Sequence, residues 1–462
     1  MDLASAPTSA ALRFAPVEPP RPRPWTGEQP LWRLLLQLRR NALVTWGAPA
    51  YELDIVSRPF LGRQSFLLND PEAIRRVLVD NHANYGRTPA TVRILHPMIG
   101  DGLFLAEGER WKRQRRAAAP AFAPRSLEVV AEVAARLAAA RLDALAHKGL
   151  GAVDLLGFVQ HLTLEVAGEA LFSQSMARHT NALRAAVERY GVRAARPGPL
   201  DFVLPAGITT PRDWVRRRLG AGFGRVVESV IAERAARGTA DPPRDLFDLL
   251  AAPAGGEGFA QGELRDQIAT LIIAGHETTA LALFWSLWLL TLAPDVQEAV
   301  AAEADAGGLA PENAQEAAAR LPLARAVVQE ALRLYPPAFT IVRAAREADT
   351  VGGREVPPDS LMVVAPWVLH RHRKLWREPD RFDPARFLPD APPPPRFAYL
   401  PFGVGPRVCI GAQFALLEAT IVLSETVRRY RITTARRGRV LPVGVVTIYP
   451  DHRPPFRLAR RA

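Results

Sequence analysis

The stretch Phe402-Gly403-Val404-Gly405-Pro406-Arg407-Val408-Cys409-Ile410-Gly411 contains the only cysteine of this 462-residue chain. Its three glycines and its proline leave little side-chain bulk, which predicts a tight turn whose backbone amides approach the sulfur closely. The apolar spacing of residues 412–419 predicts a helix that begins just after this turn. We therefore expect the helix dipole and the nearby Arg407 to lower the pKa of the Cys409 thiol.

A single cysteine restricts the chemistry that the chain can support. It excludes an internal disulfide, a CxxC redox pair, a CxxCH haem attachment and a cysteine-rich zinc site. Two interpretations of Cys409 remain. It is a buried thiol that acts as a small apolar side chain, or it is a single soft ligand for a metal.

The spacing Phe-x-x-Gly-x-Arg-x-Cys-x-Gly, formed here by Phe402, Gly405, Arg407, Cys409 and Gly411, resembles the haem-binding loop of the cytochrome P450 family. The resemblance implies a mainly α fold with a small β region, built as one large domain. It also implies a non-covalent haem b whose iron takes its axial thiolate from Cys409. Arg407 would meet a haem propionate, and Phe402 would pack beside the sulfur.

A long apolar segment from about residue 264 to residue 292 is interrupted by Ala274-Gly275-His276-Glu277-Thr278-Thr279. A membrane helix would bear a high cost for Glu277 at its centre, whereas a buried helix with paired polar groups is a credible alternative. A threonine hydroxyl that bonds back to a carbonyl beside a glycine can open or bend a helix. In the resembling family this motif crosses above the haem, with Ala274 and Gly275 beside the cofactor.

The resemblance assigns catalytic roles to Thr278 and Glu277. Thr278 would hold a water or the oxygen being activated, and Glu277 would help to relay protons from solvent. Because an enzyme that activates dioxygen needs this relay, the pair favours oxygen-activating chemistry over peroxide-driven or rearranging chemistry.

Three further residues match the family's haem contacts. Trp111 and Arg115 have the Trp-x-x-x-Arg spacing that places both side chains on one face of a helix, and Arg343 follows the Pro336-Pro337 turn. A separate set, Glu330, Arg333 and Arg386, would form a buried ionic network that holds the fold and the cysteine loop, so we exclude it from catalysis.

The apolar spacing is mostly helical from about residue 71 to residue 335, with breaks near 86–100, 194–211 and 237–260. Strands are expected near 55–68, 351–365 and 440–458, with an irregular stretch at 376–407 and a last helix that ends near Tyr430. Residues 1–30 are predicted to be a flexible, proline-rich lead-in, and residues 31–462 the catalytic domain.

The apolar segment 31–40 is too short to cross a bilayer and contains arginines. We therefore expect no integral membrane anchor, and a monomeric, cytoplasmic enzyme that resembles the soluble bacterial members. The net charge of +12 permits a nucleic acid, an anionic membrane or an acidic protein as partner. No basic stripe with interleaved aromatic residues is present, which argues against nucleic acid.

The stretches that the resemblance assigns to the substrate are mostly apolar, which suits a lipophilic molecule such as a fatty acid or terpenoid. These stretches are 86–100, 194–210, 338–342 and 446–448, together with Ile273 and Ala274. No flavin or nicotinamide fingerprint follows the cysteine loop, so electrons would come from an external ferredoxin or flavodoxin with its reductase.

The sequence thus predicts a haem-thiolate monooxygenase that inserts one oxygen atom from O2 into a lipophilic organic substrate. Two alternatives remain open. One is a peroxide-driven or rearranging haem-thiolate enzyme. The other is a non-catalytic haem protein that senses or sequesters a ligand.

Overall fold

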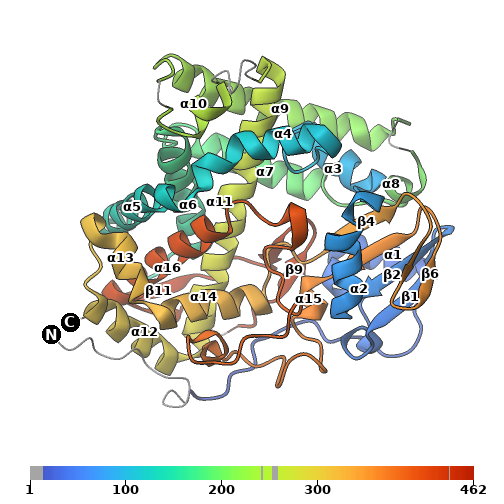
Figure 1. The fold of residues 1–462 in the computed structure, drawn as a ribbon. Coiled ribbons are helices and arrows are strands. Elements are labelled where there is room, and N and C mark those ends of the chain that lie inside the picture. Colours follow the sequence, from blue (N-terminus) through green and yellow to red (C-terminus); the bar gives the residue numbers. More distant parts are fainter. Residues whose placement is uncertain (1–13, 206, 241–242, 252–258, 436–437, 462) are drawn as a thin grey trace.

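A 32-residue helix, α11 (Gln261–Leu292), runs through the middle of the molecule and is buried along most of its length (Figure 1). The computed structural model describes residues 14–205, 207–240, 243–251, 259–435 and 438–461. Within these residues α11 is the one helix long and apolar enough to cross a membrane, yet 78% of its most apolar window lies inside the protein. It is therefore the central helix of the core.

The other helices surround α11, and the main neighbours that pack directly on it are α6, α9, α14 and α16. In chain order the helices are α1 (Leu31–Arg40), α2 (Pro71–Arg75), α3 (Pro89–Ile99), α4 (Gly108–Ala118), α5 (Leu127–Lys148), α6 (Leu155–Phe172), α7 (Thr180–Arg193), α8 (Pro199–Val203), α9 (Pro211–Ala235), α10 (Leu246–Ala251), α12 (Pro294–Gly307), α13 (Ala314–Ala319), α14 (Pro322–Leu334), α15 (Pro366–Leu369) and α16 (Ala412–Arg429).

The strands form one five-stranded sheet and three small pairs. The large sheet has the order β1-β2-β7-β4-β3, in which β2 and β7 are parallel and the other neighbours are antiparallel. Its strands are β1 (Ile55–Phe60), β2 (Arg63–Leu68), β3 (Tyr85–Gly86), β4 (Ile341–Ala345) and β7 (Leu361–Val364). The pairs are β5 (Asp349–Val351) with β6 (Arg354–Val356), β8 (Tyr430–Thr434) with β11 (Phe456–Arg460), and β9 (Pro442–Gly444) with β10 (Ile448–Pro450).

The mainly α fold with a small β region is thus confirmed, but each predicted break contains a helix. The helices α8 and α10 in the second and third breaks have only 5 and 6 residues, whereas α3 in the first has 11. Residues 86–100 contain the helix α3, because the Thr88 hydroxyl accepts a hydrogen bond from the Thr91 N–H and Pro89 occupies the first turn. Pro97 lies near the C-terminal end of α3, and Gly100 ends the helix with a φ of 51°.

The proline-rich segment before α1 is described from residue 14 onward. It runs extended along the body, where the Phe382 N–H donates to the Val17 carbonyl at 2.9 Å and the Tyr335 hydroxyl donates to the Pro20 carbonyl at 3.2 Å. Residues 14–30 are therefore held against the body rather than free of it. The rest of the predicted lead-in, 1–13, lies outside the described residues.

The predicted ionic network lies at the C-terminal end of α14. Arg333 Nε donates to Glu330 Oε2 at 2.7 Å, and Arg333 Nη2 donates to Glu330 Oε1 at 2.7 Å, with both side chains fully buried. Arg386 Nε lies 3.7 Å from Glu330 Oε1 and completes the set. The remaining N–H groups of Arg333 donate to backbone carbonyls, one of which belongs to His370 at 2.8 Å. A buried ion pair needs such further partners to offset its loss of hydration.

His370 links this network to the cysteine loop. Its Nε2 accepts a hydrogen bond from the Leu400 N–H at 2.8 Å, and its Nδ1 lies 3.2 Å from the Arg333 carbonyl oxygen. The ring is therefore neutral, with its proton on Nδ1. Burial lowers the pKa of His370 to about 3, and the charge of Arg333 acts in the same direction.

We predict that the lowered pKa of His370 makes the free energy of unfolding fall in mild acid. The unfolded imidazole titrates near pH ~6.5, whereas the folded one stays neutral down to about pH 3, so the unfolded state binds more protons between these values. This contribution to the free energy of unfolding falls as the pH drops below 6.5, by up to about 1.4 kcal/mol per pH unit.

Urea unfolding of the wild type and of His370→Gln at pH 7, 6 and 5 measures this effect, because other titrating groups are common to both proteins. The stability difference between the two proteins should shrink as the pH falls. A difference that stays constant from pH 7 to pH 5 would contradict the assignment.

Candidate active site

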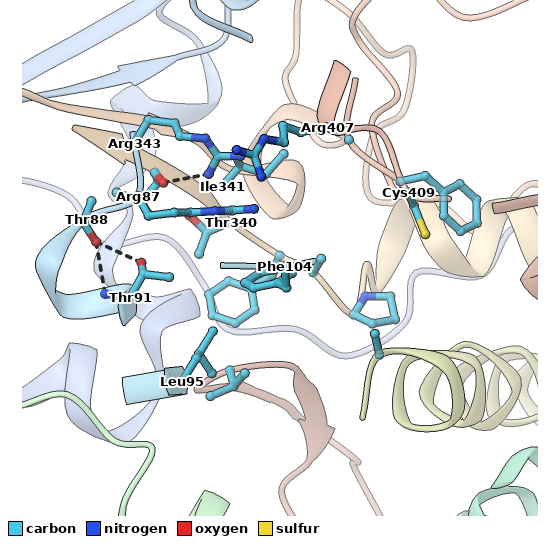
Figure 2. Close-up of a pocket in the computed structure, with 18 of the residues that line it drawn as sticks. Arg87, Thr88, Thr91, Leu95, Phe104, Thr340, Ile341, Arg343, Arg407 and Cys409 are labelled. Atoms are coloured by element: carbon cyan, nitrogen blue, oxygen red, sulfur yellow. Dashed lines mark hydrogen bonds between the residues drawn. The ribbon is translucent and has the colours of Figure 1, made fainter. Parts of the chain in front are cut away.

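A cavity of about 1000 Å³ lies between α11 and the cysteine loop. Its volume is at the upper end of the range of a typical small-molecule pocket, which leaves room for a cofactor and a substrate together. Its side walls come from α3, β4 and the turn between β9 and β10. Figure 2 shows the sulfur of Cys409 directed into this cavity from one side, with Leu95, Phe104 and Ile341 on the others.

The backbone of the cysteine loop takes the predicted tight turn. Gly403 and Gly405 have φ values of 69° and 74°, a region that side chains disfavour. A Cβ on Gly405 would lie 2.2 Å from the Leu78 carbonyl oxygen, so only glycine fits there. The Cys409 N–H donates to the Phe402 carbonyl at 2.9 Å, and α16 begins three residues after Cys409.

The thiol of Cys409 does not show the lowered pKa that we expected. The side chain is exposed to the cavity, yet the protein around it reduces its hydration and so raises its pKa above the ordinary value, while the Gly411 N–H and the charge of Arg115 act in the opposite direction. The expectation considered only the helix dipole and the cation, whereas loss of hydration has the largest effect on a thiolate in an apolar wall. A thiolate at this position therefore needs a further positive partner.

The opposite wall of the cavity is formed by Ala274, Gly275 and Thr278 of α11. The Thr278 hydroxyl donates to the Ala274 carbonyl at 2.7 Å, and the Thr279 hydroxyl donates to the Gly275 carbonyl at 3.0 Å. These are the predicted back-bonds, although α11 continues without interruption through them. A Cβ on Gly275 would meet nothing within 4 Å, so this glycine leaves open space on the cavity side.

Glu277 is placed differently from its neighbour Thr278. It is 8% exposed, does not line the cavity, and its Oε1 accepts hydrogen bonds from the Tyr449 hydroxyl at 2.5 Å and the Thr447 hydroxyl at 3.3 Å. The carboxylate therefore anchors the turn between β9 and β10, whose Val445 and Val446 line the cavity. Its part in proton relay stays a prediction, and Tyr449 is a partner that sequence reasoning missed.

Three of the predicted cofactor contacts lie together beside the loop. The Arg407 guanidinium stacks over the Trp111 ring at 4.3 Å and donates to the Ala106 carbonyl at 2.6 Å. Arg115 donates to the Val408 carbonyl at 2.7 Å, next to Cys409. All three side chains line the cavity, so α4 and the cysteine loop form one continuous surface.

Arg343 and a residue that the sequence did not reveal, Arg87, add two half-buried cations at the same edge. Figure 2 shows the side chains of Arg87, Arg343 and Arg407 gathered on one side of the cavity. Burial, reinforced by the neighbouring arginines, lowers the pKa of Arg343 to about 10 and that of Arg87 well below its ordinary value. In an arginine-rich chain nothing in the local sequence distinguished Arg87 from a surface arginine.

This arrangement fits a flat cofactor that carries negative charge at one edge. Glu107 is the carboxylate whose charge acts on all three of Arg87, Arg343 and Arg407. It also accepts a hydrogen bond from the Arg87 N–H at 2.7 Å and pairs with Arg346. Three clustered, half-buried cations that share one carboxylate would be stabilised by a further anion. The two propionates of a haem would supply it, with Cys409 on the iron and the small residues of α11 facing the ring.

The remaining walls are mostly apolar, as predicted for a lipophilic substrate. Ile94, Leu95, Phe339 and Ile341 line the cavity, whereas Met98, Ile273 and Ile448 are absent from its lining. Ile273 precedes Ala274 by one helical position, which turns it about 100° away from the cavity. Phe202 of α8 also lines the cavity, within the predicted stretch 194–210.

Comparisons with known proteins agree with this site. The family model described as Cytochrome P450 matches residues 18–444. The chain is 34% identical to cyclooctatin synthase of Streptomyces melanosporofaciens, over 88% of this chain and 89% of the relative. It is 32% identical to cyclooctat-9-en-7-ol 5-monooxygenase of the same organism, over 92% and 93%.

A solved structure, the cytochrome P450DA heme domain, has the same fold. It superimposes with a TM-score of 0.76 at 24% identity and covers 88% of this chain and 90% of its own. The family model spans the cysteine loop and α11, and both relatives align along nearly their full length. The chain therefore belongs to the cytochrome P450 family of haem-thiolate monooxygenases.

Proposed function

We propose that this enzyme oxidises an apolar, largely hydrocarbon substrate, such as a terpenoid alcohol or a fatty acid, with electrons from an external ferredoxin or flavodoxin. The observation that carries the proposal is the cavity of about 1000 Å³ that joins the Cys409 sulfur to walls of Leu95, Phe104 and Ile341. The name of one relative describes oxidation at position 5 of an unsaturated cyclic alcohol, which supports the same substrate class.

A bound haem supplies the reductive activation of O2 and the transfer of one oxygen atom to carbon. Cys409 would hold the iron, and Arg87, Arg343 and Arg407, with Trp111 and Arg115, would hold the propionate edge. Ala274 and Gly275 keep the opposite side free of bulk, so that both oxygen and substrate have access. The apolar walls exclude water from the substrate.

Thr278 is the polar side chain of α11 best placed to manage a proton in the cavity. Its hydroxyl donates to the Ala274 carbonyl in this structure and retains lone pairs that face the cavity. Glu277 lies one residue away, and its Oε1 accepts hydrogen bonds from the hydroxyls of Tyr449 and Thr447, two half-buried residues. We propose that protons reach Thr278 by this route.

Electron delivery would use the surface formed by α4. Arg115 of this helix bonds the cysteine loop, and the adjacent Lys112 and Arg116 are exposed. Several neighbouring cations already have partners: Arg113 pairs with Glu263 at 2.6 Å, Lys112 pairs with Glu109 at 2.6 Å, and Arg407 stacks on Trp111. The exposed cations favour an acidic redox protein.

A screen of spin-state shifts over cyclic alcohols, terpenes and fatty acids tests the proposed function. Compounds that displace water from the haem pocket should be apolar, and their turnover should require NADPH with a ferredoxin and its reductase. The rate of haem reduction should fall as ionic strength rises.

Turnover that needs only peroxide would favour the peroxide-driven alternative. No shift and no turnover across the screen would favour a non-catalytic haem protein.

Thr278→Ala should uncouple electron use from product formation. Product formed per NADPH should fall by about 10-fold or more, because the variant lacks a positioned group for proton transfer. The haem content and the Cys409-dependent spectrum should stay unchanged. Thr278→Ser keeps the hydroxyl and serves as the matched control, so it should retain most of the coupling. Unchanged coupling in Thr278→Ala would remove the assigned role.

A further inference from the structure

The hairpin at the edge of the large sheet brings two arginines to the active-site cavity. Its strands β1 and β2 are antiparallel, with Arg58 opposite Ser65 and Phe60 opposite Arg63. Residues directly opposite each other, and residues two apart on one strand, share a face of a sheet. All four residues line the cavity, so this face of the hairpin is one of its walls. We call Arg58, Arg63 and Ser65 the hairpin site.

The two arginines lie on the inward face of the hairpin. The opposite face exposes Ser57 and Gln64, whereas Arg58 and Arg63 are half-buried beside the buried Phe60. An antiparallel sheet normally places its polar residues on the solvent side. An inward charge can protect an edge strand from pairing with another chain, and β1 is such a strand. That reason does not apply to Arg63, because β2 has a strand on each side.

These arginines lack a counter-charge among the described residues. Neither side chain forms an ion pair or a hydrogen bond there, and burial lowers the pKa of Arg58 with no carboxylate acting against it. Of the described residues that line the cavity, Glu107 is the only acid, and it pairs with Arg346. A half-buried cation without a partner has lost hydration that an anion from outside the protein can replace.

The hairpin site is separate from the arginines that would hold the haem propionates. Arg343 belongs to β4, and the strand order β1-β2-β7-β4 places β1 three strands away, which is roughly 14 Å at about 4.8 Å per strand. The intervening strand β7 contributes Leu361 and Val363 to the cavity wall. An apolar stretch of wall therefore lies between the two groups of cations.

The surroundings of the hairpin site are also apolar. Leu38 of α1, Phe202 of α8 and Leu361 line the cavity and belong to the same apolar cluster as Phe60. A guanidinium matches a carboxylate with two parallel hydrogen bonds, and the Ser65 hydroxyl can donate a further one. This end of the cavity therefore suits a hydrocarbon that carries one carboxylate.

We propose that the hairpin site binds the carboxylate of an acidic, otherwise hydrocarbon substrate, whose apolar part extends along the cavity toward Cys409. The proposal rests on the proposed function and narrows it, from apolar molecules in general to carboxylic acids. Fatty acids and terpenoid acids share this chemistry. Arg58 is then a specificity-determining residue, because it distinguishes an acid from the alcohol or ester of the same carbon skeleton.

Binding of matched compounds to the haem-loaded full chain tests the proposal. Equilibrium dialysis measures the dissociation constants of dodecanoic acid, methyl dodecanoate and dodecanol, and of farnesoic acid and farnesol, without relying on the haem spectrum. At least one acid should bind about tenfold or more tightly than its uncharged counterpart, because a hydrogen-bonded charge pair is gained. The skeleton that shows this preference identifies the source of the carboxylate.

Arg58→Gln should raise the dissociation constant of that acid about tenfold or more and leave that of its uncharged counterpart nearly unchanged. Arg58→Lys keeps the charge but loses the paired hydrogen bonds, so it should retain part of the preference. Arg354→Gln is the matched control. Arg354 is exposed and donates to the Ser57 hydroxyl at 3.2 Å, so this variant removes the same charge from the outer face of β1. It should keep the full preference.

Three results would overturn the proposal while leaving the proposed function intact. These are equal binding of acids and their uncharged counterparts to the wild type, equal losses for both in Arg58→Gln, and a loss in Arg354→Gln as large as that in Arg58→Gln. If acids, ester and alcohols all fail to bind, the proposed function is wrong, and the hairpin site with it.

Discussion

The hydrogen bond from the Leu400 N–H to His370 Nε2 joins the buried core to the loop that holds the single cysteine. Residues 401–411 contain no strand and only one short helical turn, so their position depends on what they are tied to. His370 is in turn fixed by Arg333, which is held by Glu330 and by backbone carbonyls. A fully partnered buried ion pair is rigid, since any displacement would leave a charge without compensation. This rigidity sets where the sulfur lies.

In contrast to the Glu330–Arg333 pair, the charged groups that line the cavity lack enough partners of opposite charge within the protein. Arg87, Arg343 and Arg407 influence one another unfavourably, and Glu107 is the carboxylate that offsets them. Burial likewise disfavours the Cys409 thiolate. The negative propionates of a haem would pair with these arginines, and its positive iron would stabilise the Cys409 thiolate. Folding and cofactor binding are therefore coupled, because a ligand that binds only the folded state stabilises it.

Short-range chemistry made much of the site predictable from sequence. The glycines around Cys409, the back-bonding threonines of α11 and the Glu330–Arg333 pair all act within a few residues, and each is found as predicted. Arg87, His370 and Tyr449 could not be predicted, because the role of each depends on a segment distant in the chain. Arg87 lies near Arg343 of β4, His370 accepts a hydrogen bond from the Leu400 N–H, and Tyr449 donates one to Glu277. The helix α3 was missed for a different reason, since its capping threonine was outweighed by the prolines at each end.

The ferrous carbon monoxide difference spectrum of the wild type and of Cys409→His tests the central claim that Cys409 ligates the haem iron. The account predicts that the wild type shows the long-wavelength maximum typical of thiolate-ligated haem. Cys409→His should move that maximum to the position of histidine-ligated haem. A wild-type maximum already at the histidine position, or a spectrum that the substitution leaves unchanged, would contradict the assignment.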